Sequence, residues 1–171
     1  MKPLRPSAKA IIIRDGALLV LRMRDEVGPW YLLPGGGVDF GETLHDALHR
    51  ECREEIGCDV EVGELRFVRE YISAHHEFAH EEPDAHQIEY MFLCRLADGA
   101  LRAIEGTVPD SGTVPGLPSG TVPLLPDKGQ LGLAWLPLAT LTRYRLYPRT
   151  LRPFFLRLDD PAIPIYFGDV N

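Results

Sequence analysis

Three glutamates lie close together in the segment Gly36–Cys58, which reads GGVDFGETLHDALHRECREEIGC. On a helix that turns 100° per residue, Glu51, Glu54 and Glu55 fall within an arc of about 100° that overlaps the apolar face. Carboxylates in that position repel one another, and each costs several kcal/mol if it stays unpaired. A divalent cation would offset this cost, and an all-oxygen ligand set favours Mg²⁺ or Mn²⁺ over zinc.

Two features beside these glutamates favour a site that binds phosphate together with a metal. Arg50 lies four residues before Glu54 and next to Glu51, so its guanidinium can pair with one carboxylate and orient the other. The run Gly35–Gly37 lets the backbone approach a ligand closely and present carbonyl or amide groups to it. A glycine turn that leads into an acidic helix predicts a cation-bridged polyphosphate site.

The helix that carries the glutamates is predicted to span 43–56. Thr43 suits the N-cap, with Asp46 three residues later as a weaker form of the capping box, and Gly57 is the expected stop. Strands are predicted at 8–13, 17–23, 30–33, 59–63, 66–74, 87–96 and 135–138, with Asp15-Gly16 as a hairpin turn. The first two strands are almost entirely apolar, which predicts burial on both faces. A last helix is expected across 149–158, with Pro153 marking its first turn.

Composition limits the class of protein. The chain has 171 residues, 45% of them hydrophobic, and a net charge of −7, which predicts one globular domain over 1–171. The acidic balance disfavours a nucleic-acid polymer as partner, and no apolar run reaches the roughly 20 residues of a membrane span. The first residues lack the apolar core of a signal peptide, and the spacing of the three cysteines matches no zinc pattern. We therefore expect a reduced, cytoplasmic location without a membrane partner.

Two segments interrupt the pattern of strands and helices. Residues 75–86 are rich in His and Glu and are predicted to form a polar loop, with metal or phosphate binding as the alternative. Residues 106–126 hold three copies of Gly-Thr-Val-Pro, and so many prolines and glycines disfavour a regular element. We expect a flexible insertion there, and a lid that closes on substrate is the alternative.

The segment Gly36–Cys58 resembles the Nudix box, G-x5-E-x7-R-E-U-x-E-E-x-G-U, in which U is a large aliphatic residue. Every fixed Gly, Glu and Arg matches, while both U positions are cysteines, which pack as small hydrophobes. The segments WYLLPGG at 30–36 and LAWLPL at 133–138 are also similar to strands of the family. The resemblance implies an α/β fold, an α/β/α sandwich around a mixed β-sheet, with the box as loop–helix–loop.

The resemblance also implies an activity, the metal-dependent hydrolysis of a pyrophosphate bond in a nucleoside diphosphate linked to another moiety. By this analogy Glu51, Glu54 and Glu55 bind Mg²⁺ or Mn²⁺ together with the Gly35 carbonyl. Arg50, Glu51 and Glu54 would carry the catalysis, with Arg50 orienting Glu51. The general base stays open between a glutamate of the box, an acid in the loop at 81–84, and Glu89 of the strand at 87–96.

The substrate is the part that the sequence leaves open. Arg22 and Arg24 could hold phosphates and Trp30 could stack on a base, although each also suits a structural role. A nucleoside triphosphate, a nucleotide sugar or a related compound remains a candidate. The alternative is a non-catalytic nucleotide-binding or sensor domain of the same fold. Family members are often homodimers, but no interface can be recognised in the sequence.

Overall fold

The computed structural model describes residues 3–77, 79–80, 83–97 and 130–171. The strands are β1 (Arg5–Arg14), β2 (Ala17–Arg24), β3 (Pro29–Leu32), β4 (Val60–Ile72), β5 (His86–Leu96), β6 (Gln130–Pro137), β7 (Leu146–Tyr147) and β8 (Tyr166–Asp169). The helices are α1 (Leu44–Ile56) and the 3₁₀ helices η1 (Ser73–His75), η2 (Leu138–Arg143) and η3 (Arg149–Leu156). The insertion predicted at 106–126 lies outside the described residues.

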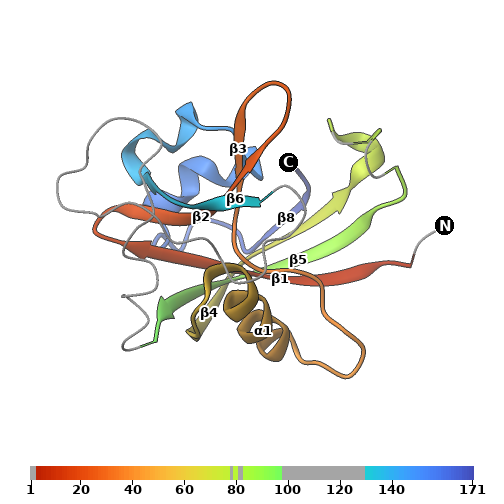
Figure 1. Ribbon diagram of the computed structural model, residues 1–171, viewed down its shortest axis with the longest axis horizontal. Helices are drawn as coiled ribbons and strands as arrows, with labels where there is room; N and C mark the ends of the chain where they lie inside the picture. Colours follow the sequence, from red (N-terminus) through yellow and green to blue (C-terminus); the bar gives the residue numbers. More distant parts are fainter. Residues whose placement is uncertain (1–2, 78, 81–82, 98–129) are drawn as a thin grey trace.

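The strands form one curled mixed sheet (Figure 1) in the order β7-β3-β2-β1-β5-β4-β8, and β6 also pairs with β2. The central pair β1–β5 is parallel, whereas β1–β2, β2–β3, β2–β6 and β4–β5 are antiparallel. The predicted hairpin is confirmed: Asp15 and Gly16 both have positive φ, 49° and 74°, a geometry that matches the twist of the flanking strands. The predicted burial of the first two strands is also confirmed, since the middle of each is buried.

The core has two parts, one on each face of the sheet. Leu48 and Cys52 of α1 pack against Ala10 and Trp135 on one face. Leu151 and Phe155 of η3 pack on the other face, which includes Ile11, and Figure 1 places α1 and the C-terminal segments on opposite sides. The mixed sheet and the loop–helix–loop are therefore confirmed, with 3₁₀ helices forming the second helical layer.

Three predicted elements differ from the structure. The segments 59–63 and 66–74 are one strand, β4, which continues past irregular pairing near Gly63, where a Cβ would come within 2.8 Å of the Leu93 carbonyl oxygen. The last helix is a 3₁₀ helix, and Pro153 inside it lacks the N–H that an α-helical ladder needs there. The short strands β7 and β8 were not predicted at all. No helix among the described residues is long and apolar enough to cross a membrane.

The loop after β2 is anchored to the C-terminal part of the chain by an ion pair. Arg145 donates through Nη1 and Nη2 to the two carboxylate oxygens of Asp25, at 3.0 and 2.7 Å. The backbone amides of Val27 and Gly28 also donate to this carboxylate. The hydrogen bonds from Arg145 and these amides lower the pKa of Asp25 from 3.8 to about 2.

We expect this pair to stabilise the fold in a way that disappears in acid. Because the folded-state pKa of Asp25 is depressed, its contribution is complete above about pH 4 and is lost as the pH falls towards 2. The melting temperatures of wild type and Asp25→Asn should therefore differ at pH 6 and converge between pH 4 and 2. Glu64→Gln, which changes an exposed carboxylate on β4, is the control. A difference that persists unchanged at pH 2 would contradict the assignment.

Candidate active site

Helix α1 begins and ends where the sequence predicts, because both ends are set by local hydrogen bonding. The Thr43 hydroxyl accepts from the Asp46 amide, and the Asp46 carboxylate accepts from the Thr43 amide, each at 3.1 Å. Gly57 ends the helix in the left-handed conformation, with φ of 71°. The capping box fixes the register of the helix and so the direction of its glutamates.

Removal of the N-cap hydroxyl should weaken this helix. We expect Thr43→Ala to lower the free energy of unfolding by about 1 kcal/mol, since the Asp46 amide in the first turn loses its acceptor. Urea unfolding followed by circular dichroism measures the change. Thr43→Ser keeps the hydroxyl and should retain most of the stability, so an equal loss in both variants would show that packing of the methyl group matters instead.

The three glutamates of α1 have different environments. Glu55 is 4% exposed, and its carboxylate accepts from the Gly35 amide at 2.6 Å. The side chain of Glu51 is 13% exposed, whereas that of Glu54 is 47% exposed. The predicted overlap with the apolar face is thus confirmed for Glu55 and Glu51, and Glu54 is the carboxylate most open to solvent.

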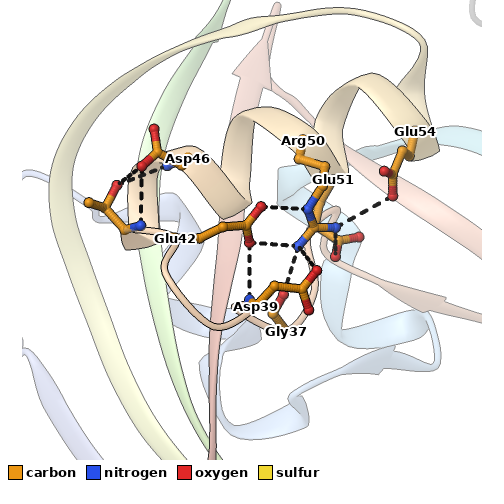
Figure 2. Close-up of polar contacts among 8 residues, drawn as sticks. Gly37, Asp39, Glu42, Asp46, Arg50, Glu51 and Glu54 are labelled. Carbon is orange, nitrogen blue, oxygen red and sulfur yellow. Dashed lines mark hydrogen bonds and ion pairs between the residues drawn. The ribbon is translucent and has the colours of Figure 1, made fainter.

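Arg50 connects the helix to the preceding loop (Figure 2). Its Nε and Nη2 donate to the two carboxylate oxygens of Glu42 at 2.8 and 3.0 Å, and Nη2 also donates to the Gly37 carbonyl. Its Nη1 donates to Glu51 at 2.7 Å and lies 3.5 Å from Glu54. The hydrogen bonds from Arg50 lower the pKa of Glu42 to about 2, and the pKa of Arg50 is raised in turn. Arg50 therefore stays charged and holds Glu51 in place.

The glycine turn is needed because other groups lie directly against its backbone. A Cβ at Gly36 would come within 2.5 Å of the Glu51 carboxylate, and one at Gly35 within 2.2 Å of the Ala8 carbonyl oxygen. The Ala8 amide and the Ser7 hydroxyl both donate to the Gly36 carbonyl at 2.9 Å. The turn is thus pinned to β1 while the Glu51 carboxylate covers it.

The carbonyl of Gly35 has a cationic partner. Lys9 of β1 donates its Nζ to this carbonyl, while the Gly35 amide donates to Glu55. The carboxylate and carbonyl oxygens at this turn are the kind of ligand that Mg²⁺ and Mn²⁺ prefer. The Lys9 ammonium group beside the Gly35 carbonyl indicates that this position suits a cation. Within the described ranges, no three His, Cys, Asp or Glu side chains are gathered closely enough to hold a metal.

Glu89 is buried, although the simplest interpretation of its place in the sequence is a solvent-exposed strand residue. It is 7% exposed, and Arg69 of β4 donates to its carboxylate at 2.6 Å. Burial acts to raise the pKa of Glu89, but the charges of Arg69 and Lys9 outweigh it and lower that pKa. Of the other acids considered as base, Asp84 is exposed, and Glu81 and Glu82 lie outside the described residues.

The predicted substrate-binding residues lie on two faces of the sheet. Arg22 and Arg24 alternate along β2 with Met23, which belongs to the core on the α1 side, so both arginines lie on the opposite face. Trp30 packs on the α1 side and makes an edge-to-face contact with Tyr147, at 6.0 Å between ring centroids. The structure therefore does not bring these three side chains together.

Two histidines of the His-rich segment contact an aspartate near the C-terminus, and the cysteines are buried. His75 Nδ1 and His76 Nε2 lie 2.6 and 2.7 Å from the two carboxylate oxygens of Asp169 in β8. Cys52, Cys58 and Cys94 are buried free thiols. Burial raises the pKa of Cys58 to about 11, and it raises the pKa of the other two thiols further, so all three stay protonated at neutral pH.

Sequence reasoning missed Lys9, Arg69 and Asp169. A charged residue inside a buried apolar run was the available signal for Lys9, which interrupts the segment AKAIII. No comparable signal exists for the contacts of Asp169, whose histidine partners lie more than 90 positions earlier.

Comparison with known proteins agrees with this geometry. The NUDIX domain model matches residues 3–111. The chain is 32% identical over 117 residues to the NAD-capped RNA hydrolase NudC of Chromobacterium violaceum, which covers 65% of this chain and 40% of NudC. It is 48% identical over 50 residues to the nucleoside triphosphatase NudI of Escherichia fergusonii, which covers 28% of this chain and 36% of NudI. The alignments thus span well under half of these relatives.

The fold comparison covers nearly the whole chain. The crystal structure of a MutT NUDIX hydrolase from Burkholderia pseudomallei superposes with a TM-score of 0.57 at 21% identity, covering 94% of this chain and all of that one (100%). At this identity the likeness concerns the fold alone.

Proposed function

Since the chain belongs to the NUDIX domain family, we propose that it hydrolyses a pyrophosphate bond in a small nucleotide-type substrate. The observation that carries the proposal is the Arg50 centre, in which one guanidinium pairs with Glu42, Glu51 and Glu54 beside the glycine turn. A helix that serves only for packing has no need of three carboxylates around one arginine at the edge of a core.

The cation, Mg²⁺ or Mn²⁺, would be held by Glu51, Glu54, Glu55 and the Gly35 carbonyl. When bound, it neutralises charge on the phosphate oxygens and lowers the pKa of a coordinated water. Arg50 keeps Glu51 at the turn, since it forms a 2.7 Å hydrogen bond from a guanidinium that Glu42 holds from the other side. The Glu55 carboxylate accepts from the Gly35 amide, which holds the glycine turn against α1.

For the general base we favour Glu54 over Glu89. The Glu54 side chain is 47% exposed and lies 3.5 Å from Arg50, so its carboxylate can accept a proton from attacking water. Glu89 is engaged by Arg69 at 2.6 Å and is buried, which leaves it poorly placed to exchange protons with water. Arg22 and Arg24, on the face that also holds Lys9 and Glu89, are proposed to bind phosphate oxygens.

The test is hydrolysis of a substrate panel with Mg²⁺ and with Mn²⁺, with products separated by HPLC. The panel contains nucleoside triphosphates, oxidised nucleoside triphosphates, nucleotide sugars, ADP-ribose and diadenosine polyphosphates. A preferred substrate that requires the metal, and whose products show which phosphorus is attacked, supports the proposal. Tight nucleotide binding without hydrolysis under any condition would support the alternative, a nucleotide-binding domain of the same fold.

A further inference from the structure

A cavity of about 610 Å³ lies beside the loop that precedes α1. Its walls come from the start of β1, the loop at 38–42 and the start of β5, with Leu4, Arg5, Phe40, Glu42, His86 and Gln87 among the lining residues. The volume falls in the range of ligand sites, roughly 300–1,000 Å³. Apart from Glu42, none of these residues has a role in the chemistry proposed above.

Phe40 presents a fully exposed aromatic ring to this cavity. The loop that carries it is held firmly, because the Asp39 amide donates to the Glu42 carboxylate at 3.0 Å and the Glu42 amide donates to the Asp39 carbonyl at 3.1 Å. Arg50 fixes Glu42 in turn (Figure 2). A ring that is exposed on a fixed loop loses the stabilisation of burial unless a ligand covers it, and a flat ring suits a nucleobase.

Arg5 supplies a cation on the wall that β1 forms. Its guanidinium lies against Gly37, where a Cβ would come within 2.0 Å of Nε, so only glycine leaves room for it. Among the residues that the structure describes, the Arg5 side chain has no hydrogen bond or ion pair. A planar guanidinium with unused donors is suited to bind phosphate oxygens.

The cavity borders the glycine turn, because Arg5 of its wall lies with its guanidinium against Gly37. The Gly37 carbonyl accepts from the same Arg50 that holds Glu51, and the Glu51 carboxylate lies against Gly36. A phosphate at Arg5 would therefore be one residue along the turn from the glutamate that is proposed to bind the metal. On the remaining walls, the Asp39 carboxylate and the Gln87 amide can hydrogen-bond the edge of a base.

We propose that this cavity binds the nucleoside part of the substrate, with the base against Phe40 and a phosphate of the same nucleotide at Arg5. The proposal deepens the proposed function and rests on it for the identity of the substrate. It names a recognition site only, so it adds no step to the hydrolysis.

The test measures binding separately from turnover. AMP is titrated by calorimetry into the full chain without divalent metal, using wild type, Phe40→Ala and Arg5→Gln. Each variant should bind AMP about tenfold more weakly, the loss expected for one stacking or one charged contact. Val27→Ala, at an exposed hydrophobic residue of another loop, and Arg95→Gln, at an exposed cation of β5, are matched controls that should bind like wild type. The affinity for ribose 5-phosphate, which lacks a base, should fall in Arg5→Gln but not in Phe40→Ala.

The outcomes separate this site from the activity itself. If both variants bind AMP like wild type, the cavity is not the nucleoside site, even if the panel shows hydrolysis. If sedimentation shows that Phe40→Ala dissociates a dimer without changing AMP affinity, the surface is an interface between copies of the chain and the proposal is wrong. If AMP binding depends on both residues but no panel compound is hydrolysed, the cavity assignment holds and the proposed hydrolysis fails.

Discussion

Replacing Glu54 by glutamine is expected to lower kcat by about a thousandfold at saturating Mg²⁺. The variant removes a carboxylate that is proposed both to bind the metal and to accept a proton, whereas its structural contacts are slight. Its ion pair with Arg50 is 3.5 Å long at a 47% exposed side chain, and such a pair contributes little to stability. The change is measured as single-substrate kinetics on the preferred compound of the panel.

The design of this experiment depends on the difference among the three glutamates. Glu51 and Glu55 are engaged with Arg50 and the Gly35 amide, so their replacement would disturb the turn as well as the chemistry. The melting temperature of Glu54→Gln should therefore lie within about a degree of that of wild type. Its affinity for Mn²⁺, measured by electron paramagnetic resonance, should nevertheless be lower. Glu64→Gln on β4 is the control at another exposed glutamate. Turnover within threefold of wild type in Glu54→Gln would remove this residue from the mechanism.

Local chemistry explains what could be predicted about α1 and its loop. A threonine, an aspartate three residues later and a terminal glycine set the ends of the helix, and the structure has both caps in place. The pairing of Arg50 with Glu54 follows from helix geometry, because the two side chains lie four residues, about one turn, apart. The resemblance to the Nudix box rests on the same short range of sequence.

The contacts that complete the site could not be predicted because they join distant parts of the chain. Lys9 of β1 reaches Gly35 in the turn before α1, and Arg69 reaches Glu89 across a strand pair whose register is irregular near Leu65. Register depends on how the whole sheet packs, so it cannot be deduced from either strand alone. The exposure of the Phe40 ring could not be predicted either, because it depends on how the loop before α1 folds.

The predicted helix type near the C-terminus was wrong for a different reason. The segment at 149–158 has the spacing of an amphipathic helix, and Leu151 and Phe155 are indeed buried against the sheet. Spacing alone does not distinguish an α-helix from a short 3₁₀ helix. Pro153 disfavours the α-helix here because it lacks the N–H that an α-helical hydrogen bond needs.

Breaking the buried ion pair between β4 and β5 should be the most destabilising single change. In Arg69→Met, the Glu89 carboxylate would be left buried without its main partner, which typically costs 3–5 kcal/mol. The side chains are 5% and 9% exposed and lie 2.6 Å apart, so little solvent is available to compensate. Because the charge of Lys9 still acts on Glu89, we expect a loss at the lower end of this range, about 3 kcal/mol of the free energy of unfolding. Urea unfolding measures this loss.

A second variant separates the ion pair from the other contacts of the arginine. Arg69 also donates to the Val170 carbonyl at 2.6 Å, so its loss should loosen β8 as well. Arg69→Met combined with Glu89→Met removes the uncompensated charge and should recover most of the stability, because two apolar side chains can fill the same space. Hydrogen exchange of the β8 amides should stay fast in both variants, since neither restores the bond to Val170. Arg95→Met, at an exposed position of β5, is the control. A loss below about 1 kcal/mol in Arg69→Met would mean that water reaches Glu89, which would return this carboxylate to the candidates for the general base.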